Sequence, residues 1–246
     1  MIKIVRKLKG IIVSEVPYKE TSKIINVFTE ELGIIGVVAR GVKKLKSTLV
    51  ISKLSLGYFH IFYKEKSLSN LIEFDSINNF KNIKKDIYKI SYATFITELT
   101  TQVYKHSSHK DIFNLYISTL IKINEGYNAS ILTNILELKY LQYLGIMPVI
   151  DKCVVCSSPN NLVTVSSYKG GYLCSNCCKN EKIVDLKTIK LIRMLFYLDI
   201  ANITKLDISD KIICQINSFI DDYYERYAGL YLKSKTFLKN LKYEEV

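Results

Sequence analysis

Short runs in which apolar and polar residues alternate fill the first 80 residues of the chain. Five such runs, rich in Ile, Val, Phe and Tyr, are "KGIIVSEVPY", "SKIINVFTEE", "GIIGVVARG", "LSLGYFHIFYKE" and "SNLIEFDSI". Turn signals such as Pro17 and Gly33 separate them, which is the pattern of short strands. Five short strands in this length predict a small barrel, and an OB-fold suits the pattern. An SH3-like barrel is the alternative that the pattern leaves open.

Apolar residues repeat at helical spacing from about residue 81 onward. In "IKKDIYKISYATFITELTTQVYKH" the repeating residues are Ile83, Ile87, Ile90, Leu99 and Val103, and we expect a helix there. A second helix is expected from after His109 to about Glu125, with one face made by Ile112, Tyr116, Leu120 and Ile123. The third, "ASILTNILELKYLQYLG", ends at Gly145 and is followed by Pro148, a usual stop signal.

Two more helices are expected after a cysteine-rich segment. Asp185 is a suitable N-cap for "LKTIKLIRMLFYL", and Ser209 is suitable for "DKIICQINSFIDDYYERY". The predicted fold class is therefore α+β multidomain. A five-stranded OB-fold barrel spans residues 1–80, and an all-α domain spans residues 81–246 and carries the cysteine-rich insert at 150–180.

The insert holds five of the six cysteines in "DKCVVCSSPNNLVTVSSYKGGYLCSNCCK". Two Cys-x-x-Cys pairs, separated by 17 residues, are formed by Cys153, Cys156, Cys174 and Cys177. This spacing is typical of a zinc finger with four thiolate ligands. Catalytic zinc sites usually keep an open position, often with His ligands, so we expect one structural Zn²⁺. Cys178 is the alternative fourth ligand, and Cys214 is expected to be a buried apolar residue.

Disulfides and catalysis are both disfavoured. The opening "MIKIVRKLKGIIVSEV" has too short an apolar run for a secretory signal, and clustered thiols in a reducing cytosol bind metal more often than they pair. No apolar run reaches the length of a membrane span, so no membrane partner is expected. Without a signal or a membrane span, we expect a cytoplasmic protein. The chain has neither a Gly-rich phosphate loop nor a Ser/His/Asp set, so we do not expect an enzyme.

A net charge of +12 favours polyanionic partners. Residues 1–80 carry 13 Lys and Arg against 7 Asp and Glu, which is half of this excess. Two groups of basic residues are candidate DNA contacts. The group expected before the first strand is Lys3, Arg6, Lys7 and Lys9, and the group expected after the third strand is Arg40, Lys43, Lys44 and Lys46. In an OB-fold, such segments contact nucleic-acid phosphates while aromatic rings stack on bases. Phe28, Tyr58 and Tyr63 are the candidate stacking residues, although barrel aromatics also serve as core.

The order of several short motifs resembles the RecO family of bacterial DNA repair proteins. "GIIVSEVPYKETSKIINVFTEELGIIGVVARGVKKLKS" is similar to the family's opening, with its "Y-x-E-x-x-K" and "FT-x-E-x-G" turns and a basic run after "ARG". "LELKYLQYLGIMPVIDKCVVC" is similar to the helix that leads into the first cysteine pair, and "GGYLCSNC" is similar to the second pair. The basic run uses Lys where many relatives use Arg, which weakens bidentate phosphate contacts.

The resemblance implies an OB-fold, a helical domain and a four-cysteine zinc finger. It implies binding of single- and double-stranded DNA, annealing of complementary strands and, with RecR, loading of RecA onto DNA coated by single-strand binding protein. It also implies a nucleoid-associated protein that docks the acidic C-terminal tail of single-strand binding protein, for which Lys190, Arg193 and Arg226 are candidate contacts. The alternatives are an OB-fold and zinc-ribbon RNA-binding protein, or a nucleic-acid-modifying enzyme.

Overall fold

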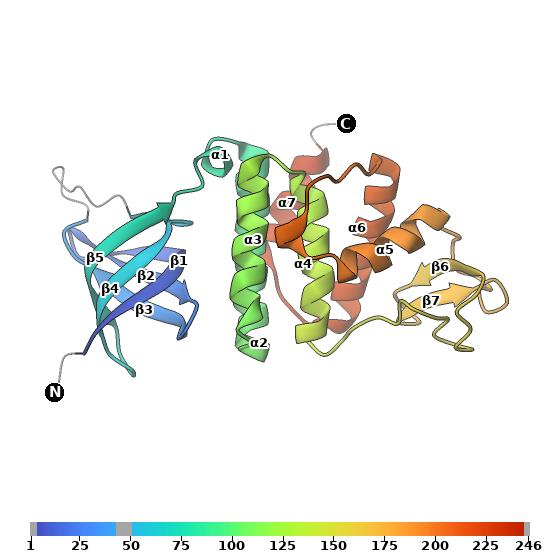
Figure 1. Ribbon diagram of the computed structural model, residues 1–246, viewed down its shortest axis with the longest axis horizontal. Helices are drawn as coiled ribbons and strands as arrows, with labels where there is room; N and C mark the ends of the chain where they lie inside the picture. Colours follow the sequence, from blue (N-terminus) through green and yellow to red (C-terminus); the bar gives the residue numbers. More distant parts are fainter. Residues whose placement is uncertain (1–3, 43–50, 244–246) are drawn as a thin grey trace.

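The computed structural model describes residues 4–42 and 51–243. A five-stranded barrel lies at one end of the molecule, a cluster of helices fills the middle, and a two-stranded hairpin lies at the other end (Figure 1). The barrel thus precedes a helical domain, as predicted.

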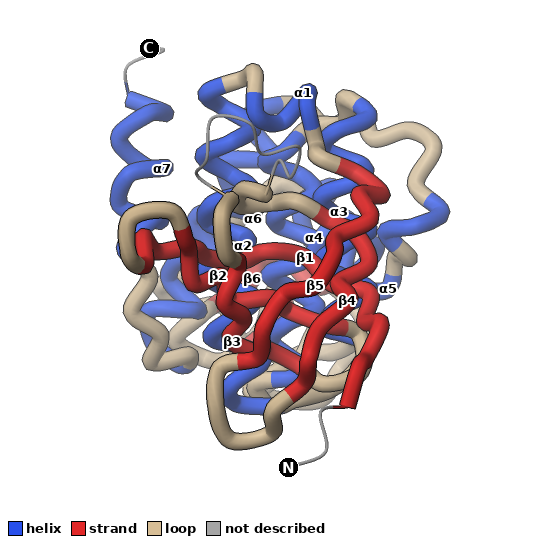
Figure 2. The backbone as a smooth tube through the Cα atoms, turned by 90° about the vertical axis from the view of Figure 1, so that its left-hand side faces the viewer, coloured by secondary structure: helices blue, strands red, loops and turns tan. Residues whose placement is uncertain are grey.

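The barrel contains β1 (Ile4–Tyr18), β2 (Ser22–Thr29), β3 (Gly33–Ala39), β4 (Leu56–Tyr63) and β5 (Ser69–Asn78). Its strands close in the order β1-β2-β3-β5-β4, with β3 and β5 parallel and the other pairs antiparallel. This is a five-stranded Greek-key barrel of the OB-fold type. The view in Figure 2, turned by 90°, places the barrel strands in front of the helices.

Strand β1 begins earlier than the sequence predicted, because its two halves pair with different neighbours. Ile4 to Ile11 pair with β4, whereas Gly10 to Tyr18 pair with β2. The expectation that the first basic residues precede the strand is therefore wrong: Arg6, Lys7 and Lys9 lie within β1.

The barrel has two apolar layers, one inside and one facing the helices. Leu8, Ile12 and Phe59 are buried inside the barrel, whereas Phe28 belongs to the core shared with the helical domain. The Phe28 ring is fully buried, and its centroid lies 4.7 Å from the ring centroid of Tyr104. The prediction that Phe28 stacks on bases is wrong, because this side of β2 is covered by helices.

The helical domain begins with α1 (Lys81–Lys84) and α2 (Ile87–Ser107), where one helix was predicted. The chain breaks at Asp86, whose carboxylate accepts hydrogen bonds from the backbone N–H groups of Tyr88 and Lys89 and so starts a new helix. Ile87 lies in this first turn and is exposed, contrary to the prediction of an apolar face. The predicted second and third helices are confirmed as α3 (Asp111–Glu125) and α4 (Ala129–Tyr143).

Beyond the insert lie α5 (Leu186–Tyr197), the short 3-10 helix η1 (Ile200–Asn202) and α6 (Asp210–Tyr227). Asp185 caps α5 as predicted, whereas Ser209 holds the N-cap position of α6 without a side-chain hydrogen bond. Cys214 is exposed, so its predicted burial is wrong, because the apolar stripe of α6 lies on the other side of the helix. Within the described residues, none of the helices is long and apolar enough to cross a bilayer.

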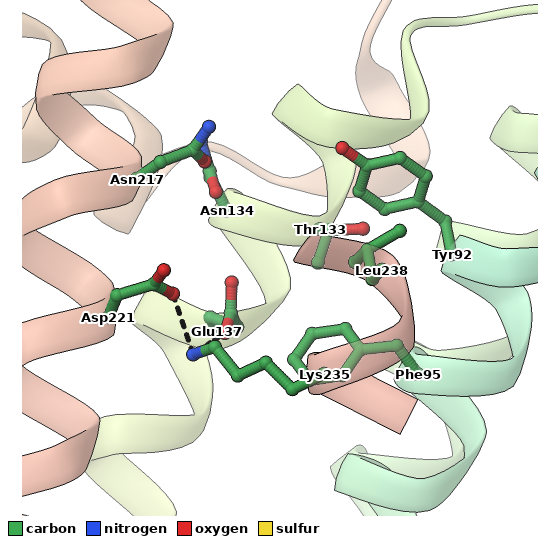
Figure 3. A pocket seen from close by; sticks show the side chains of 9 residues that line it. All are labelled: Tyr92, Phe95, Thr133, Asn134, Glu137, Asn217, Asp221, Lys235 and Leu238. Carbon is green, nitrogen blue, oxygen red and sulfur yellow. Dashed lines mark ion pairs between the residues drawn. The ribbon is translucent and has the colours of Figure 1, made fainter. Parts of the chain in front are cut away.

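A last helix, α7 (Lys233–Tyr243), was not predicted, because its sequence is mostly polar. The Glu98 carboxylate of α2 accepts hydrogen bonds from the backbone N–H groups of Lys233 and Ser234 and so fixes the start of α7. Lys235 extends between α4 and α6 to the carboxylates of Glu137 and Asp221 (Figure 3). Polar contacts therefore position this helix on the bundle.

Candidate metal centre and nucleic-acid interface

The cysteine insert folds as a hairpin of β6 (Leu162–Ser166) and β7 (Gly171–Cys174). Gly170 has a φ of 83°, in the left-handed region that favours glycine, and makes the tight turn between the two strands. Gly171 lies against the Val149 backbone, where a Cβ atom would collide with the carbonyl group. The hairpin thereby carries Cys174 toward the first cysteine pair.

The four expected ligand sulfurs, those of Cys153, Cys156, Cys174 and Cys177, lie within 4.8 Å of one another. The Cys156 and Cys174 sulfurs are 3.6 Å apart, and a tetrahedral zinc site with bonds of about 2.3 Å has sulfurs about 3.8 Å apart. The donor set therefore fits a four-coordinate structural metal site. Cys178 turns away, and its thiol donates to the Glu181 carbonyl oxygen instead.

The cluster also stabilises negative charge on sulfur. Burial would raise the pKa of the Cys153 thiol, but backbone N–H groups, foremost that of Cys156, donate to the sulfur and lower the pKa to about 6. The pKa of Cys177 is raised to about 12, chiefly by its hydrogen bond to the Cys156 sulfur. A bound cation favours the thiolate form of all four ligands.

Side-chain contacts join the hairpin to the helices behind it. The Tyr172 hydroxyl donates to the Ile189 carbonyl oxygen over 2.5 Å, and the Ser167 hydroxyl donates to Asp222 of α6. Arg193 of α5 donates to Asp151 over 2.6 Å. A metal ion that holds the hairpin together therefore also supports its contact with α5 and α6.

Two of the cations suggested for docking an acidic tail already have carboxylate partners. Arg193 pairs with Asp151, and Arg226 pairs with Asp222. Lys190 is exposed on α5. These positions keep less uncompensated positive charge than the sequence indicated.

On the barrel, the predicted cations lie beside aromatic rings. The Arg6 guanidinium lies 4.9 Å from the ring centroid of Tyr63, and the Lys7 ammonium lies 4.7 Å from that of Tyr58. Such contacts are worth about 0.5–1 kcal/mol at exposed sites. Tyr58 keeps 38% of its surface exposed.

Acidic neighbours compensate two of these cations. Lys7 lies 3.8 Å from an oxygen of Asp75, and Lys9 lies 3.4 Å from an oxygen of Glu30. The sequence alone did not indicate these pairs, because the partners come from other strands or turns. The net positive charge of β1 that is available to a polyanion is therefore smaller than the number of its lysines suggests.

Arg40, the first cation of the basic segment after β3, differs from Lys7 and Lys9 in this respect. Arg40 is exposed and donates to the neutral side-chain oxygen of Asn70 over 3.4 Å, so its charge is not compensated there. Lys43, Lys44 and Lys46 follow directly in the sequence and, like Lys3, lie outside the described residues.

Together, the barrel, the helical domain and the four-cysteine hairpin define a class of protein: an OB-fold joined to an all-α domain with a cysteine cluster that fits a structural metal ion. Residues 1–80 match the family Recombination protein O N terminal, and residues 84–236 match Recombination protein O C terminal. The chain therefore belongs to the RecO family of DNA repair proteins.

Curated relatives extend this match over nearly the full length. DNA repair protein RecO of Listeria monocytogenes serotype 4b (strain CLIP80459) is 34% identical over 241 residues, covering 96% of this chain and 94% of the relative. The proteins of the same name from Halalkalibacterium halodurans and Bacillus cereus (strain AH187) are 31% and 32% identical over 241 residues. These two alignments cover 96% of this chain, and 95% and 97% of the relatives, respectively.

Proposed function

We propose that this chain is a recombination mediator that binds single- and double-stranded DNA and anneals complementary strands. With RecR, it helps to load RecA onto DNA coated by single-strand binding protein. The observation that carries the proposal is RecO family membership along nearly the whole chain. It is combined with an OB-fold whose third strand is followed by Arg40, which has no carboxylate partner among the described residues, and by a basic segment of the sequence. No bond-making chemistry is needed for this role.

The proposed mechanism is charge neutralisation. Complementary strands repel each other through their phosphates, and a basic surface that holds them lowers this repulsion and raises their local concentration. Arg40 and the lysines that follow it in the sequence, Lys43, Lys44 and Lys46, are the proposed main contacts with phosphates. Arg6, Lys7 and Lys9 of β1, with Lys3 before them in the sequence, are proposed to add to this contact. The exposed ring of Tyr58 offers a stacking surface for a base.

Zinc is the ion proposed for the four-cysteine site. Four thiolates select zinc over harder ions such as Mg²⁺ or Ca²⁺. The ligands are Cys153, Cys156, Cys174 and Cys177, and the ion orders a polar hairpin that buries too little apolar surface to fold alone. Its role is to keep the helical domain rigid, where contacts with RecR and with the tail of single-strand binding protein are proposed.

An annealing assay tests the central proposal. The purified chain is expected to accelerate pairing of complementary oligonucleotides coated with single-strand binding protein. Addition of RecR is expected to accelerate RecA filament assembly on the coated strand. Annealing at the rate of a protein-free control, at low ionic strength, would contradict the proposal, whereas turnover of a nucleotide substrate would support the enzyme alternative.

Salt dependence tests the proposed DNA-contacting segment. Each phosphate contact contributes a slope of about −0.7 to log K against log salt for single strands. Replacing Lys43, Lys44 and Lys46 together with Gln should therefore make this slope less steep by about 2. The control removes an equal charge from exposed lysines near the zinc hairpin and α5, namely Lys179, Lys182 and Lys187. An equal loss of slope in both variants would exclude a specific contact by this segment.

Single substitutions separate compensated from uncompensated cations. Arg40→Gln is expected to weaken DNA binding more than Lys9→Gln, because Lys9 already pairs with Glu30. Fluorescence anisotropy with a short labelled oligonucleotide measures both. Equal affinity losses would show that the ion pair does not reduce the contribution of Lys9.

A further inference from the structure

A second group of metal-ligating side chains lies on the outer surface of the barrel, remote in sequence from the cysteine hairpin. His60 of β4 and Glu73 of β5 are directly paired across the two strands, and Asp75 is paired with Tyr58. One donor atom from each of His60, Glu73 and Asp75 lies within 4.8 Å of the other two. The geometry points to a binding site for a divalent transition-metal ion of the zinc or cobalt type.

The sheet places these side chains on one face. Phe59 and Phe74, which alternate with them along the two strands, pack in or against the barrel core, so His60, Glu73 and Asp75 project outward. Both strands belong to a closed barrel, and their backbones are held by neighbours on either side. The donors are therefore brought together by a rigid sheet, which limits the entropy lost when an ion binds.

The donor set suits a borderline divalent ion. An imidazole with two carboxylates matches the nitrogen and oxygen ligands that zinc accepts at about 2.0–2.2 Å, and solvent can complete the coordination. Donor atoms around a tetrahedral ion with such bonds lie about 3.4 Å apart. Glu73 is exposed, so its side chain is free to rotate toward a bound ion.

His60 and Asp75 are already in contact. The His60 Nε2 atom lies 2.9 Å from an Asp75 oxygen, and the His60 side chain is 25% exposed. A metal ion would replace the shared proton of this contact. Glu73 provides the third donor, which distinguishes the site from an ordinary histidine–aspartate surface pair such as His109 with Asp111.

Lys7 competes with the ion. Its ammonium lies 3.8 Å from the same Asp75 oxygen that contacts His60. A bound divalent ion would take over Asp75 and change the local charge of Lys7, Glu73 and Asp75 from net negative to net positive. The face beside Tyr58 would then attract anions instead of repelling them. The site itself rests on these contacts and does not depend on the proposed DNA binding.

Cobalt titration of the zinc-loaded protein tests the site. Wild type is expected to bind one further equivalent of Co²⁺, with absorption typical of nitrogen and oxygen ligands and without the sulfur-to-metal charge transfer of a thiolate site. His60→Gln and Glu73→Gln should each weaken this binding by roughly 10-fold or more. Lys7→Met should strengthen it, because the competing cation is removed.

His109→Gln is the matched control, because His109 also contacts an aspartate but has no third donor among the described residues. It should leave the additional equivalent unchanged. Binding of no further Co²⁺ by folded wild type would overturn the proposal. So would equal binding by wild type and the His60→Gln variant, with folding of each variant checked by circular dichroism.

Discussion

Substitution of Lys235 tests how the C-terminal helix is held on the bundle. The Lys235 ammonium lies 2.7 Å from an Asp221 oxygen and 3.5 Å from a Glu137 oxygen (Figure 3). The side chains of Lys235 and Glu137 are only 18% and 6% exposed. Lys235→Met preserves much of the aliphatic stem but removes the cation that faces two carboxylates in a largely buried site.

The expected cost is set by Glu137, which would lose its cationic partner while remaining buried. Removal of one partner of a buried ion pair typically costs about 3–5 kcal/mol. Asp221 is 34% exposed and can be hydrated, so we expect about 3 kcal/mol, near the lower end. For a chain of this size, 1 kcal/mol corresponds to about 2–4 °C in Tm, which predicts a decrease of about 6–12 °C.

Thermal and urea unfolding measured by circular dichroism give the free energy, and Lys233→Met is the matched control. Lys233 is an exposed lysine two residues earlier in the same helix. Glu137→Gln added to Lys235→Met should restore part of the stability, because the remaining partner is then uncharged. Equal effects of Lys233→Met and Lys235→Met would refute the reasoning.

The pH dependence provides a second measurement. Burial lowers the pKa of Lys235, but Glu137 and Asp221 outweigh burial and raise it above its usual 10.5. A raised folded-state pKa means that the stabilisation is fully present below pH 10.5 and is lost as the pH rises through the folded-state value. The difference between wild type and Lys235→Met should therefore stay constant from neutral pH to pH 10.5 and decrease above it.

Three further predictions concern the four-cysteine hairpin and the barrel. Cys156→Ser should abolish metal binding at the four-cysteine cluster, measured as loss of the sulfur-to-metal charge transfer of bound Co²⁺, and lower Tm. Cys214→Ser, at an exposed cysteine outside the cluster, should do neither. Unchanged charge transfer in Cys156→Ser would contradict the site. Phe28→Ala should lower the free energy of urea unfolding by about 3–5 kcal/mol, because it opens a cavity between the barrel and the helices. Tyr58→Ala should mainly reduce DNA affinity. A larger loss of stability in Tyr58→Ala than in Phe28→Ala would contradict this assignment. Hydrogen bonds from the Ser167 hydroxyl and, after it, from Arg226 lower the pKa of Asp222 below its usual 3.8. Wild type should therefore be more stable than Asp222→Asn above pH 3.8, and this advantage should vanish as the pH falls through the folded-state pKa. An advantage that persists unchanged in acid would exclude the hydrogen bonds of Asp222 as its source.

Local patterns in the sequence were enough to predict most of the elements. Alternating β-branched and aromatic residues predicted five strands, and helical spacing with stop signals such as Gly145 predicted α3 and α4. The cysteine spacing predicted a cluster that the structure brings together. These signals depend on residues near one another in the chain, where backbone geometry relates spacing directly to position.

Interactions between distant segments decided the rest. The burial of Phe28 follows from helices that cover β2, and α7 is positioned by Glu98 and by the Glu137 and Asp221 carboxylates, far away in sequence. The pairing of β4 with β5 likewise brings His60 and Glu73 together and places Asp75 beside Lys7. The sequence by itself determined most of the elements and the cysteine spacing. Only the tertiary structure decided which faces are covered and which charges are compensated, because both depend on contacts between residues that the chain keeps far apart.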